Sequence, residues 1–421
     1  MLIWKILLFA SWGIIFYNYA GYAIIALIFN KLFPYRDHLT IADEAIPEEP
    51  PVSFIVAAYN ERHFIETKIK NSLAQDYPAS KIEFIFVTDG STDETYDIIH
   101  AHPSIHLLHR PERLGKTDAL NRAVAVASHE VIIVSDANTI LNKDAVRLIA
   151  AHYALPHVGG VAGEKKVVPV LPVEGQVGYR LAAGGGMTGG IVRDAAHDDG
   201  PGEGEGLYWK YESALKRIDS EFYSVVGAAG ELFSFRKSLY EPIPATVILD
   251  DFIISMRIAE KGYRVLYEPG AYAMETPSFS MEEERKRKVR IAAGGFQSVV
   301  MLSELLSFWK YPRLSFLYIS HRVLRWFASP FCLVLALVAG VILCLGDLHP
   351  FYQWLMAAQL AFFGLGLLYP FLPGRGPLRI FRQFAKLSRY FIFMNFSVIL
   401  GFWRWLRNKQ PAAWEKSRRA N

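Results

Sequence analysis

Long apolar segments lie at both ends of the chain and enclose a polar central region. Residues 2–29, 326–345 and 351–372 are dominated by aliphatic and aromatic side chains, and residues 390–406 form a weaker fourth run. A helix needs about 20 apolar residues to cross a hydrocarbon core about 30 Å thick. The pattern therefore predicts an integral membrane protein with transmembrane helices at both ends.

Basic residues outside these runs predict how the chain is oriented. They follow the first and third runs and are absent from the turn at residues 346–350, between the second and third runs. Because Lys and Arg accumulate on the cytoplasmic side, we expect the central region in the cytoplasm and the N-terminus outside. A crossing by residues 390–406 would put the basic tail outside, against this rule, so that run either crosses the membrane or lies at its surface.

The stretch before the second apolar run carries His321, Arg322 and Arg325 among aliphatic residues, with Trp326 at its end. This pattern is typical of a helix in the membrane surface, with Trp and Arg at headgroup level. The alternative is that the second run simply begins here. The predicted divisions are an N-terminal anchor at 1–29, a linker at 30–51, a polar domain at 52–310, an interfacial helix at 311–326, transmembrane helices at 327–406 and a basic tail at 407–421.

The polar domain alternates short apolar segments with amphipathic ones. Residues 52–58, 82–87, 105–108 and 131–134 read as buried strands, and helices are predicted between them, the first of them capped by Asn60. Such alternation predicts an α/β domain with a parallel sheet covered by helices on both faces. Ligands of these sheets bind at the carboxyl ends of the strands. The first candidates are therefore the polar residues that follow strands: Tyr59, Asn60, Glu61, Asp89, Asp136 and Asn138.

Composition agrees with a membrane protein that carries a polar domain. Hydrophobic residues make up 52% of the chain and charged residues 20%, against about 25% charged residues in an ordinary soluble domain. The net charge is +4, from 45 basic and 41 acidic residues. This excess is too small to indicate nucleic-acid binding.

Three polar groupings could carry chemistry. Asp136 and Asn138 offer oxygen ligands for a divalent cation that bridges a diphosphate, although an Asp-x-Asn pair alone also fits a strand-end turn. Asp250 and Asp251 precede an apolar helix, where they could act as a base or cap the helix. Arg287 and Arg290 would share one helical face, suited to phosphate binding or simply to solvent.

Together these groupings resemble the ordered motifs of the membrane-embedded family 2 glycosyltransferases of the GT-A type. This group includes hyaluronan, cellulose and poly-N-acetylglucosamine synthases and many exopolysaccharide transferases. The resemblance extends from residue 52 to residue 297. It rests on the segments AAYNE at 57–61, VTDGSTD at 87–93, GKTDALN at 115–121, DAN at 136–138, YWKYE at 208–212, GAAGELFSFR at 227–236, DD at 250–251 and RKVRI at 287–291.

The resemblance implies an α/β GT-A (Rossmann-like, nucleotide-binding) cytoplasmic domain at 52–310 and roles for individual residues. Asp251 would be the catalytic base, beside Asp250, and a divalent cation, Mg²⁺ or Mn²⁺, would bind at Asp136 and Asn138. Gly230 and Glu231 would lie on the acceptor side. The residues implied to hold a nucleotide-sugar, expected to be UDP-linked, are Tyr59, Glu61, Asp89, Lys116, Asp136, Arg287 and Arg290.

The implied function is inverting transfer of a sugar to a membrane-associated glycan or lipid-linked acceptor in polysaccharide biosynthesis, at a bacterial inner or plasma membrane. The sequence departs from the family's pattern at two places. Asn138 replaces a second metal-binding Asp, and Ile291 replaces the Trp that stacks on the acceptor sugar in processive synthases. The second departure favours addition of one or a few sugars. The alternatives are a processive polysaccharide synthase and an inactive membrane scaffold.

Overall fold

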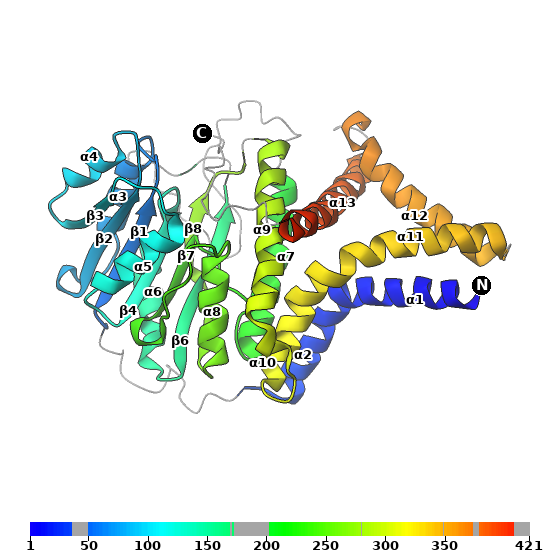
Figure 1. Ribbon diagram of the computed structural model, residues 1–421, viewed down its shortest axis with the longest axis horizontal. Coiled ribbons are helices and arrows are strands. Elements are labelled where there is room, and N and C mark those ends of the chain that lie inside the picture. Colours follow the sequence, from blue (N-terminus) through cyan, green and yellow to red (C-terminus); the bar gives the residue numbers. More distant parts are fainter. Residues whose placement is uncertain are drawn as a thin grey trace.

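The structure is a computed structural model of the full chain (Figure 1). It describes residues 1–35, 49–168, 171, 202–278, 280–347, 349–373 and 379–407. Residues 36–48 of the predicted linker and 408–421 of the predicted basic tail lie outside this set.

An eight-stranded sheet forms the centre of the polar domain, in the order β3-β2-β1-β4-β7-β6-β8-β5. All but one of its strands are at least five residues long, and most of their residues are buried. The strands are β1 (Val52–Ala58), β2 (Ile82–Asp89), β3 (Ile105–Arg110), β4 (Val131–Asp136), β5 (Ile140–Leu141), β6 (Val158–Val167), β7 (Leu232–Arg236) and β8 (Arg264–Glu275).

Helices cover both faces of the sheet because its apolar residues point both ways. On one face, the core joins β1 and β4 to α3 (Ile65–Leu73), α4 (Thr95–His100) and α6 (Ala145–Ala151). On the other face, the sheet packs against α5 (Lys116–Val126), α7 (Gly202–Phe222), α8 (Asp250–Glu260) and α9 (Met281–Met301). The predicted α/β architecture with two covered faces is confirmed.

The sheet is mixed and not wholly parallel as the alternation predicted. Strands β3, β2, β1 and β4 are mutually parallel, but β7 runs antiparallel between β4 and β6. An antiparallel strand begins where its parallel neighbour ends. Ser135 near the end of β4 therefore pairs with Leu232 at the start of β7, which brings Gly230 and Glu231 beside Asp136. Residues far apart in sequence meet at one edge for this reason.

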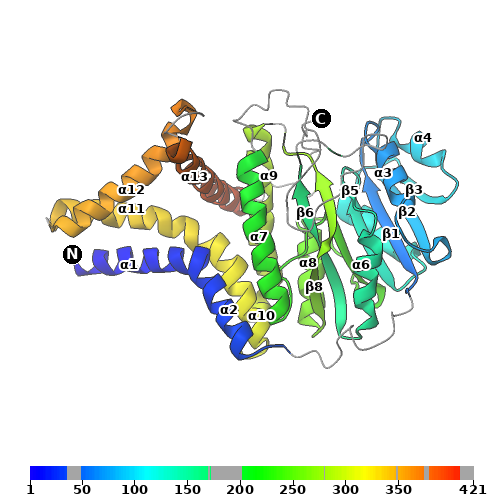
Figure 2. The ribbon, with the colours of Figure 1, turned by 180° about the vertical axis from the view of Figure 1, so that it is seen from behind.

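Three helical segments are long and apolar enough to cross a membrane, within the described part of the chain: Leu2–Leu32, Pro312–Gly346 and Pro350–Phe371. They comprise α1 (Leu2–Phe16), η1 (Tyr17–Gly21) and α2 (Tyr22–Leu32), then α10 (Pro312–Tyr318), η6 (Ile319–Ala328) and α11 (Ser329–Gly346), and finally α12 (Pro350–Leu368) with the short turn after it. Both views show α1 and α11 running side by side away from the sheet domain, with α7 and α9 between them and the sheet (Figures 1 and 2).

The fourth predicted run lies in α13 (Arg379–Leu406), which is not among these three segments. This helix carries basic residues near both of its ends and packs against α9 and α12. Phe402 and Trp405 of α13 contact the buried ring of Phe296 in α9, with ring centroids 5.2 and 5.8 Å apart. It therefore links the membrane helices to α9 of the polar domain.

The predicted interfacial stretch is not a separate helix, because α10, η6 and α11 form one continuous helical segment. Its polar side chains also pack against the polar domain: His321 and Arg325 are buried and Arg322 is half-buried. Arg322 and Arg325 of η6 form ion pairs with Glu212 of α7, and His321 bonds to Asp219 of the same helix at 2.6 Å. The basic residues of this stretch thus join the membrane helices to the sheet domain.

Candidate active site

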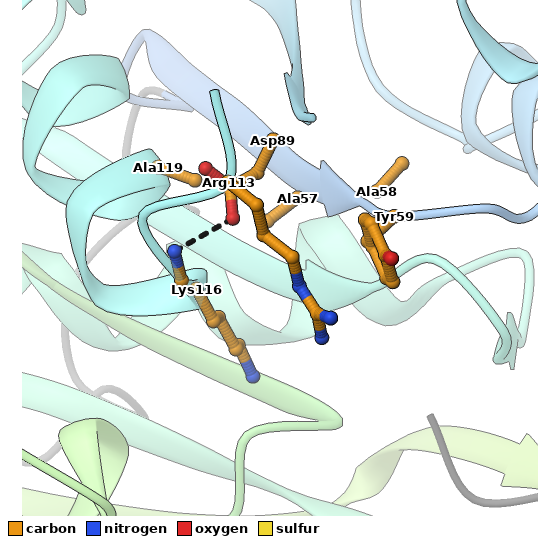
Figure 3. A pocket seen from close by; sticks show the side chains of 8 residues that line it. Ala57, Ala58, Tyr59, Asp89, Arg113, Lys116 and Ala119 are labelled. Carbon is orange, nitrogen blue, oxygen red and sulfur yellow. Dashed lines mark hydrogen bonds between the residues drawn. The ribbon is translucent and has the colours of Figure 1, made fainter. Parts of the chain in front are cut away.

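A pocket opens at the carboxyl ends of β1 and β2, at the edge where sequence analysis expects ligands. Tyr59 follows β1, and Arg113 precedes α5. The Arg113 guanidinium lies 3.8 Å from the centre of the Tyr59 ring, and Figure 3 shows the two side chains facing each other. A flat ring backed by a cation is suited to binding a planar, anionic ligand. The pocket is lined by Ala57, Ala58, Tyr59, Asp89, Arg113, Gly115, Lys116 and Ala119.

Asp89 forms the floor of the pocket and organises the loop above it. Its carboxylate accepts hydrogen bonds from the backbone N–H groups of Leu114 (3.0 Å) and Gly115 (2.7 Å), the second of which is drawn in Figure 3. Arg122 lies 3.8 Å from the same carboxylate. Asp89 is thus in the predicted site, where it also fixes the loop that carries Arg113.

Glycine is required where this loop passes over the end of β2. Gly90 has φ +67°, and a Cβ there would lie 2.8 Å from the Arg113 backbone nitrogen. Gly115 begins α5 with φ +101°, a conformation that L side chains rarely adopt. These two glycines let the loop lie close to the sheet, so that Arg113 and Lys116 extend into the pocket.

Lys116 connects the pocket to Asp136 at the end of β4. Its Nζ donates a hydrogen bond of 2.6 Å to Asp136 Oδ1. Burial opposes the charge of Lys116, but the carboxylates of Asp136 and Asp250 raise the pKa of this ammonium above its ordinary value. Burial raises the pKa of Asp136, whereas the Lys116 ammonium opposes that rise. The pair therefore places a fixed cation and a carboxylate at the centre of the site.

Asp250 and Asp251 begin α8 on the opposite side of Lys116. Burial and the neighbouring Asp250 carboxylate raise the pKa of Asp251 to about 7. A Cβ on Gly230 would lie 3.2 Å from Asp251 Oδ2 and 2.9 Å from Lys116 Nζ. Any side chain at Gly230 would fill the space between these groups, so the glycine leaves the Asp251 carboxyl accessible. A carboxyl with a pKa near 7 is suited to general-base catalysis.

The two arginines of α9 have different surroundings. Arg287 is held by Glu284, which accepts from its Nε at 3.1 Å, and lies 3.8 Å from Glu275. Arg290 makes no hydrogen bond or ion pair with any residue that the structure describes. Burial lowers the pKa of Arg290, and the nearby carboxylates of Asp250 and Asp251 oppose that shift. Arg290 can thus offer its guanidinium to an anion.

Glu231 is part of a buried ion-pair network behind the site. Its carboxylate accepts from Lys165 Nζ at 2.5 Å, and Lys165 also pairs with Glu275. Although burial acts against it, the Lys165 ammonium holds the pKa of Glu231 well below its ordinary range. Glu231 therefore remains an anion near Asp136 and Asp251, and it is not placed to take up a proton at neutral pH.

The oxygen donors present fit a divalent cation only when phosphate completes the set. No group of three His, Cys, Asp or Glu side chains in the described segments could hold a metal ion. Asp136 supplies one carboxylate, and the half-buried Asn138 amide bonds to no other described residue. Mg²⁺ typically takes one or two carboxylates together with substrate phosphates, so this donor set fits a cation bound with a diphosphate.

Glu61, one of the predicted site residues, lies away from the groups described above, and two residues near the site were not predicted. Glu61 is buried beside α4, where its backbone N–H donates to Thr95 Oγ1 at 2.8 Å. Arg113 was missed although it lies just before the predicted Gly-Lys motif. Lys165 was missed because it lies within a strand whose pattern gives no sign of a charged partner.

Comparison with known proteins finds a family that resembles the segment containing most of these strands. Residues 53–242 match the model of the family described as glycosyl transferase family 2. This segment, a little under half of the chain, is thus similar to family 2 glycosyltransferases. The matched segment includes Tyr59, Asp89, Lys116 and Asp136, whereas Asp251 lies beyond its end.

Relatives of the glycosyltransferase domain include two bacterial synthases. The chain is 26% identical over 278 residues to the poly-beta-1,6-N-acetyl-D-glucosamine synthase of Staphylococcus aureus (strain COL), covering 64% of this chain and 60% of that protein. It is 26% identical over 294 residues to the synthase of the same name from Staphylococcus epidermidis, covering 68% and 64%. The similarity thus spans less than two thirds of these relatives.

A solved structure shares the fold along nearly the whole chain. The mannosyltransferase PcManGT from Pyrobaculum calidifontis, in complex with GDP-Man and Mn²⁺, superposes with a TM-score of 0.68 at 21% sequence identity. The superposition covers 96% of this chain and 99% of that chain. The predicted GT-A fold of the glycosyltransferase domain is therefore confirmed, with helices that are apolar enough to cross a membrane at both ends of the chain.

Proposed function

We propose that this protein is an inverting glycosyltransferase that moves a sugar from a nucleotide-sugar donor to a membrane-associated acceptor. The observation that carries the proposal is the convergence of a half-buried candidate base, Asp251, with Lys116 and Asp136 next to the Tyr59 pocket. A nucleotide pocket, cations for a diphosphate and a base are the parts such a transfer requires. The family match supports the same reaction.

The donor occupies the pocket with its diphosphate directed toward Lys116. Tyr59 and Arg113 contact the nucleoside, and Lys116 and Arg290 bind phosphate oxygens. Two groups that carry charge before the donor arrives are suited to stabilising the diphosphate as it leaves. A UDP-sugar is the expected donor. PcManGT is described with GDP-Man, so GDP-mannose is the second donor to test.

Transfer takes place in a single displacement. Asp251 accepts the proton of an acceptor hydroxyl, whose oxygen forms a bond to the anomeric carbon. The bond from that carbon to the phosphate oxygen breaks, and the nucleoside diphosphate leaves. Because the new bond forms opposite the departing one, the anomeric configuration inverts. Gly230 keeps the space in front of Asp251 open for the acceptor.

A divalent cation, Mg²⁺ or Mn²⁺, would be held by Asp136 and Asn138 together with the diphosphate. When bound, it supplies positive charge to the leaving phosphates. Asn138 contributes a neutral amide where the family has a second carboxylate. The protein's ligands therefore contribute less of the free energy of cation binding than two carboxylates would, and the phosphates contribute more.

The acceptor reaches the site from the membrane side, as a glycan or a lipid-linked sugar. Helices α7 and α9 adjoin both the site and the membrane helices, which supports this direction of entry (Figure 1). The glycosyltransferase domain is proposed to lie in the cytoplasm, since the basic residues of the loops are on its side of the membrane.

A processive polysaccharide synthase is the second candidate function. It is favoured by the names of the two staphylococcal relatives, which are polymer synthases. Ile291 argues against it, because an aliphatic side chain has no flat face for a sugar ring.

The test is nucleoside diphosphate release by the full chain in nanodiscs, measured with a panel of UDP-sugars and GDP-mannose. We expect release with one donor and a strong increase when a membrane extract supplies acceptor. The absence of release or donor binding with every donor would contradict the proposal and favour an inactive scaffold.

A further inference from the structure

A lysine lies fully buried directly beneath the Asp136 turn. Lys68 belongs to α3 and is 0% exposed, with its ammonium 5.8 Å from the centre of the Phe54 ring. Lysine is almost never fully buried in proteins unless its charge is paired. Burial lowers the pKa of Lys68 from 10.5 to about 7, and the nearby Asp136 opposes that shift. Because burying an ammonium group is unfavourable in free energy, the position of Lys68 indicates a specific role.

The hydrogen bonds of Lys68 all go to one turn. Its Nζ donates to Ser135 Oγ at 2.7 Å, to the Thr139 carbonyl at 3.1 Å and to Thr139 Oγ1 at 3.4 Å. Three acceptors match the three hydrogens of an ammonium. Ser135 and Thr139 flank the Asp136–Asn138 segment, so one buried side chain holds both ends of the turn.

The same network reaches the rest of the site. Thr139 Oγ1 donates to the Asp136 carbonyl at 2.9 Å, and Ser135 Oγ donates to the Glu231 carbonyl at 3.0 Å. The turn of β4 is thereby joined to the start of β7, next to Gly230. A change at Lys68 would therefore move Asp136 relative to the acceptor side.

We propose that Lys68 is a positioning residue that holds Asp136 and Asn138 in the geometry needed to bind a divalent cation with the donor diphosphate. This inference rests on the proposed function. Lys68 itself touches no substrate; it acts through the backbone of the turn and through Ser135. Residues that orient metal ligands from behind change metal affinity by about 10- to 100-fold when they are replaced.

The experiment compares Lys68→Met with two other variants of the full chain in nanodiscs. Met fills a similar volume without donating hydrogen bonds. Thr139→Val removes the bond to the Asp136 carbonyl and avoids placing a new side chain in the lysine's site. Lys70→Met is the matched control, since Lys70 is on the same helix but exposed and pairs with Glu66 at 3.4 Å.

Mn²⁺ binding is measured by electron paramagnetic resonance at saturating UDP, and unfolding temperature is measured on the same samples. We expect the Mn²⁺ dissociation constant to rise about 10- to 100-fold in Lys68→Met and to rise in Thr139→Val, with no change in Lys70→Met. In the double variant Lys68→Met/Thr139→Val, the Mn²⁺ dissociation constant should rise by less than the product of the two single rises, because both substitutions act on one turn.

A purely structural lysine would lower the unfolding temperature and leave Mn²⁺ affinity unchanged, which would overturn the inference. Unchanged or tighter Mn²⁺ binding in Lys68→Met would do so as well, while leaving the proposed function intact. If Lys68→Met does not fold, Thr139→Val decides by the same measurement. Failure of the wild-type protein to bind UDP with Mn²⁺ would instead contradict the UDP and cation assignments on which this inference rests.

Discussion

At the scale of single residues, Asp251 is the side chain on which the proposed chemistry depends. Its half-buried side chain lies next to Asp250 and close to Gly230, where a Cβ would be 3.2 Å from Oδ2. Asp251→Asn keeps the shape and removes the base. We expect turnover to fall by about 10²- to 10⁴-fold with nucleotide binding retained. Calorimetry with UDP and a release assay check this, with the exposed Asp97→Asn as the control. Near-normal turnover would show that another group is the base.

The pKa of Asp251 also predicts how activity depends on pH. A general base works only when deprotonated, so kcat/KM should rise as pH increases through about 7 and level off above it. Below that pH, kcat/KM should fall about tenfold for each pH unit. The profile is measured between pH 5 and 9 with fixed metal and donor. Activity that is flat across this range would contradict the assignment of a base whose pKa is raised by burial.

Asp136 predicts the response to metal. Asp136→Ala removes the carboxylate of the proposed cation site and breaks its ion pair with Lys116. We expect transfer to become undetectable and the stimulation by Mn²⁺ or Mg²⁺ to disappear. The wild-type protein should likewise lose activity in excess chelator and regain it when cation is restored. Full wild-type activity in chelator would rule out the cation requirement.

At the scale of elements, hydrophobic periodicity predicts where the strands lie. It predicts poorly which residues form hydrogen bonds with one another. The first strand, Val52–Ala58, lies where its apolar run predicts it. The predicted cap at Asn60 is wrong, because α3 begins only at Ile65 and Asn60 instead accepts from the Thr92 N–H at 2.8 Å. Propensity in a short window cannot reveal a bond to a residue 32 positions away.

The same limit explains which parts of the site could be predicted. Motifs that follow strands locate Tyr59, Asp89 and Asp136, because strand ends meet at one edge whatever the loops do. Lys68 has the pattern of an ordinary polar helix position, and its partners lie 67 and 71 residues away. The antiparallel course of β7, which sets the position of Glu231, also depends on tertiary pairing.

The junction of α7 with η6 yields a prediction about stability. Glu212 is buried and pairs with Arg322 at 3.0 Å and with Arg325. Glu212→Ala would break both ion pairs, one of them with the buried Arg325, and removing one partner of a buried pair costs about 3–5 kcal/mol. We expect a clearly lower unfolding temperature in detergent. Glu304→Ala, which breaks an exposed pair with Lys310, should change it little.

At the scale of the whole molecule, the membrane helices give a prediction about the length of the product. Three segments qualify as spans in the described part of the chain, and α13 packs on α9 beside the site. Together with Ile291, this favours addition of one or a few sugars over long polymers. Product length is measured against the ratio of enzyme to acceptor. Long chains at early times, with most acceptor unused, would establish processivity and contradict this prediction.

The ion pair between Lys116 and Asp136 affects how the binding of the proposed donor depends on the binding of the cation. In the free protein each group satisfies the other, so a cation alone must displace an ammonium and a diphosphate alone must displace a carboxylate. If the proposed donor and cation bind together, Lys116 would pair with phosphate and Asp136 with the cation, so each would exchange one partner for another. Linkage then requires each ligand to strengthen the other's binding by the same factor. The enzyme would respond to the donor–cation complex as a unit, and free cation or free nucleotide in the cell would compete weakly for the site.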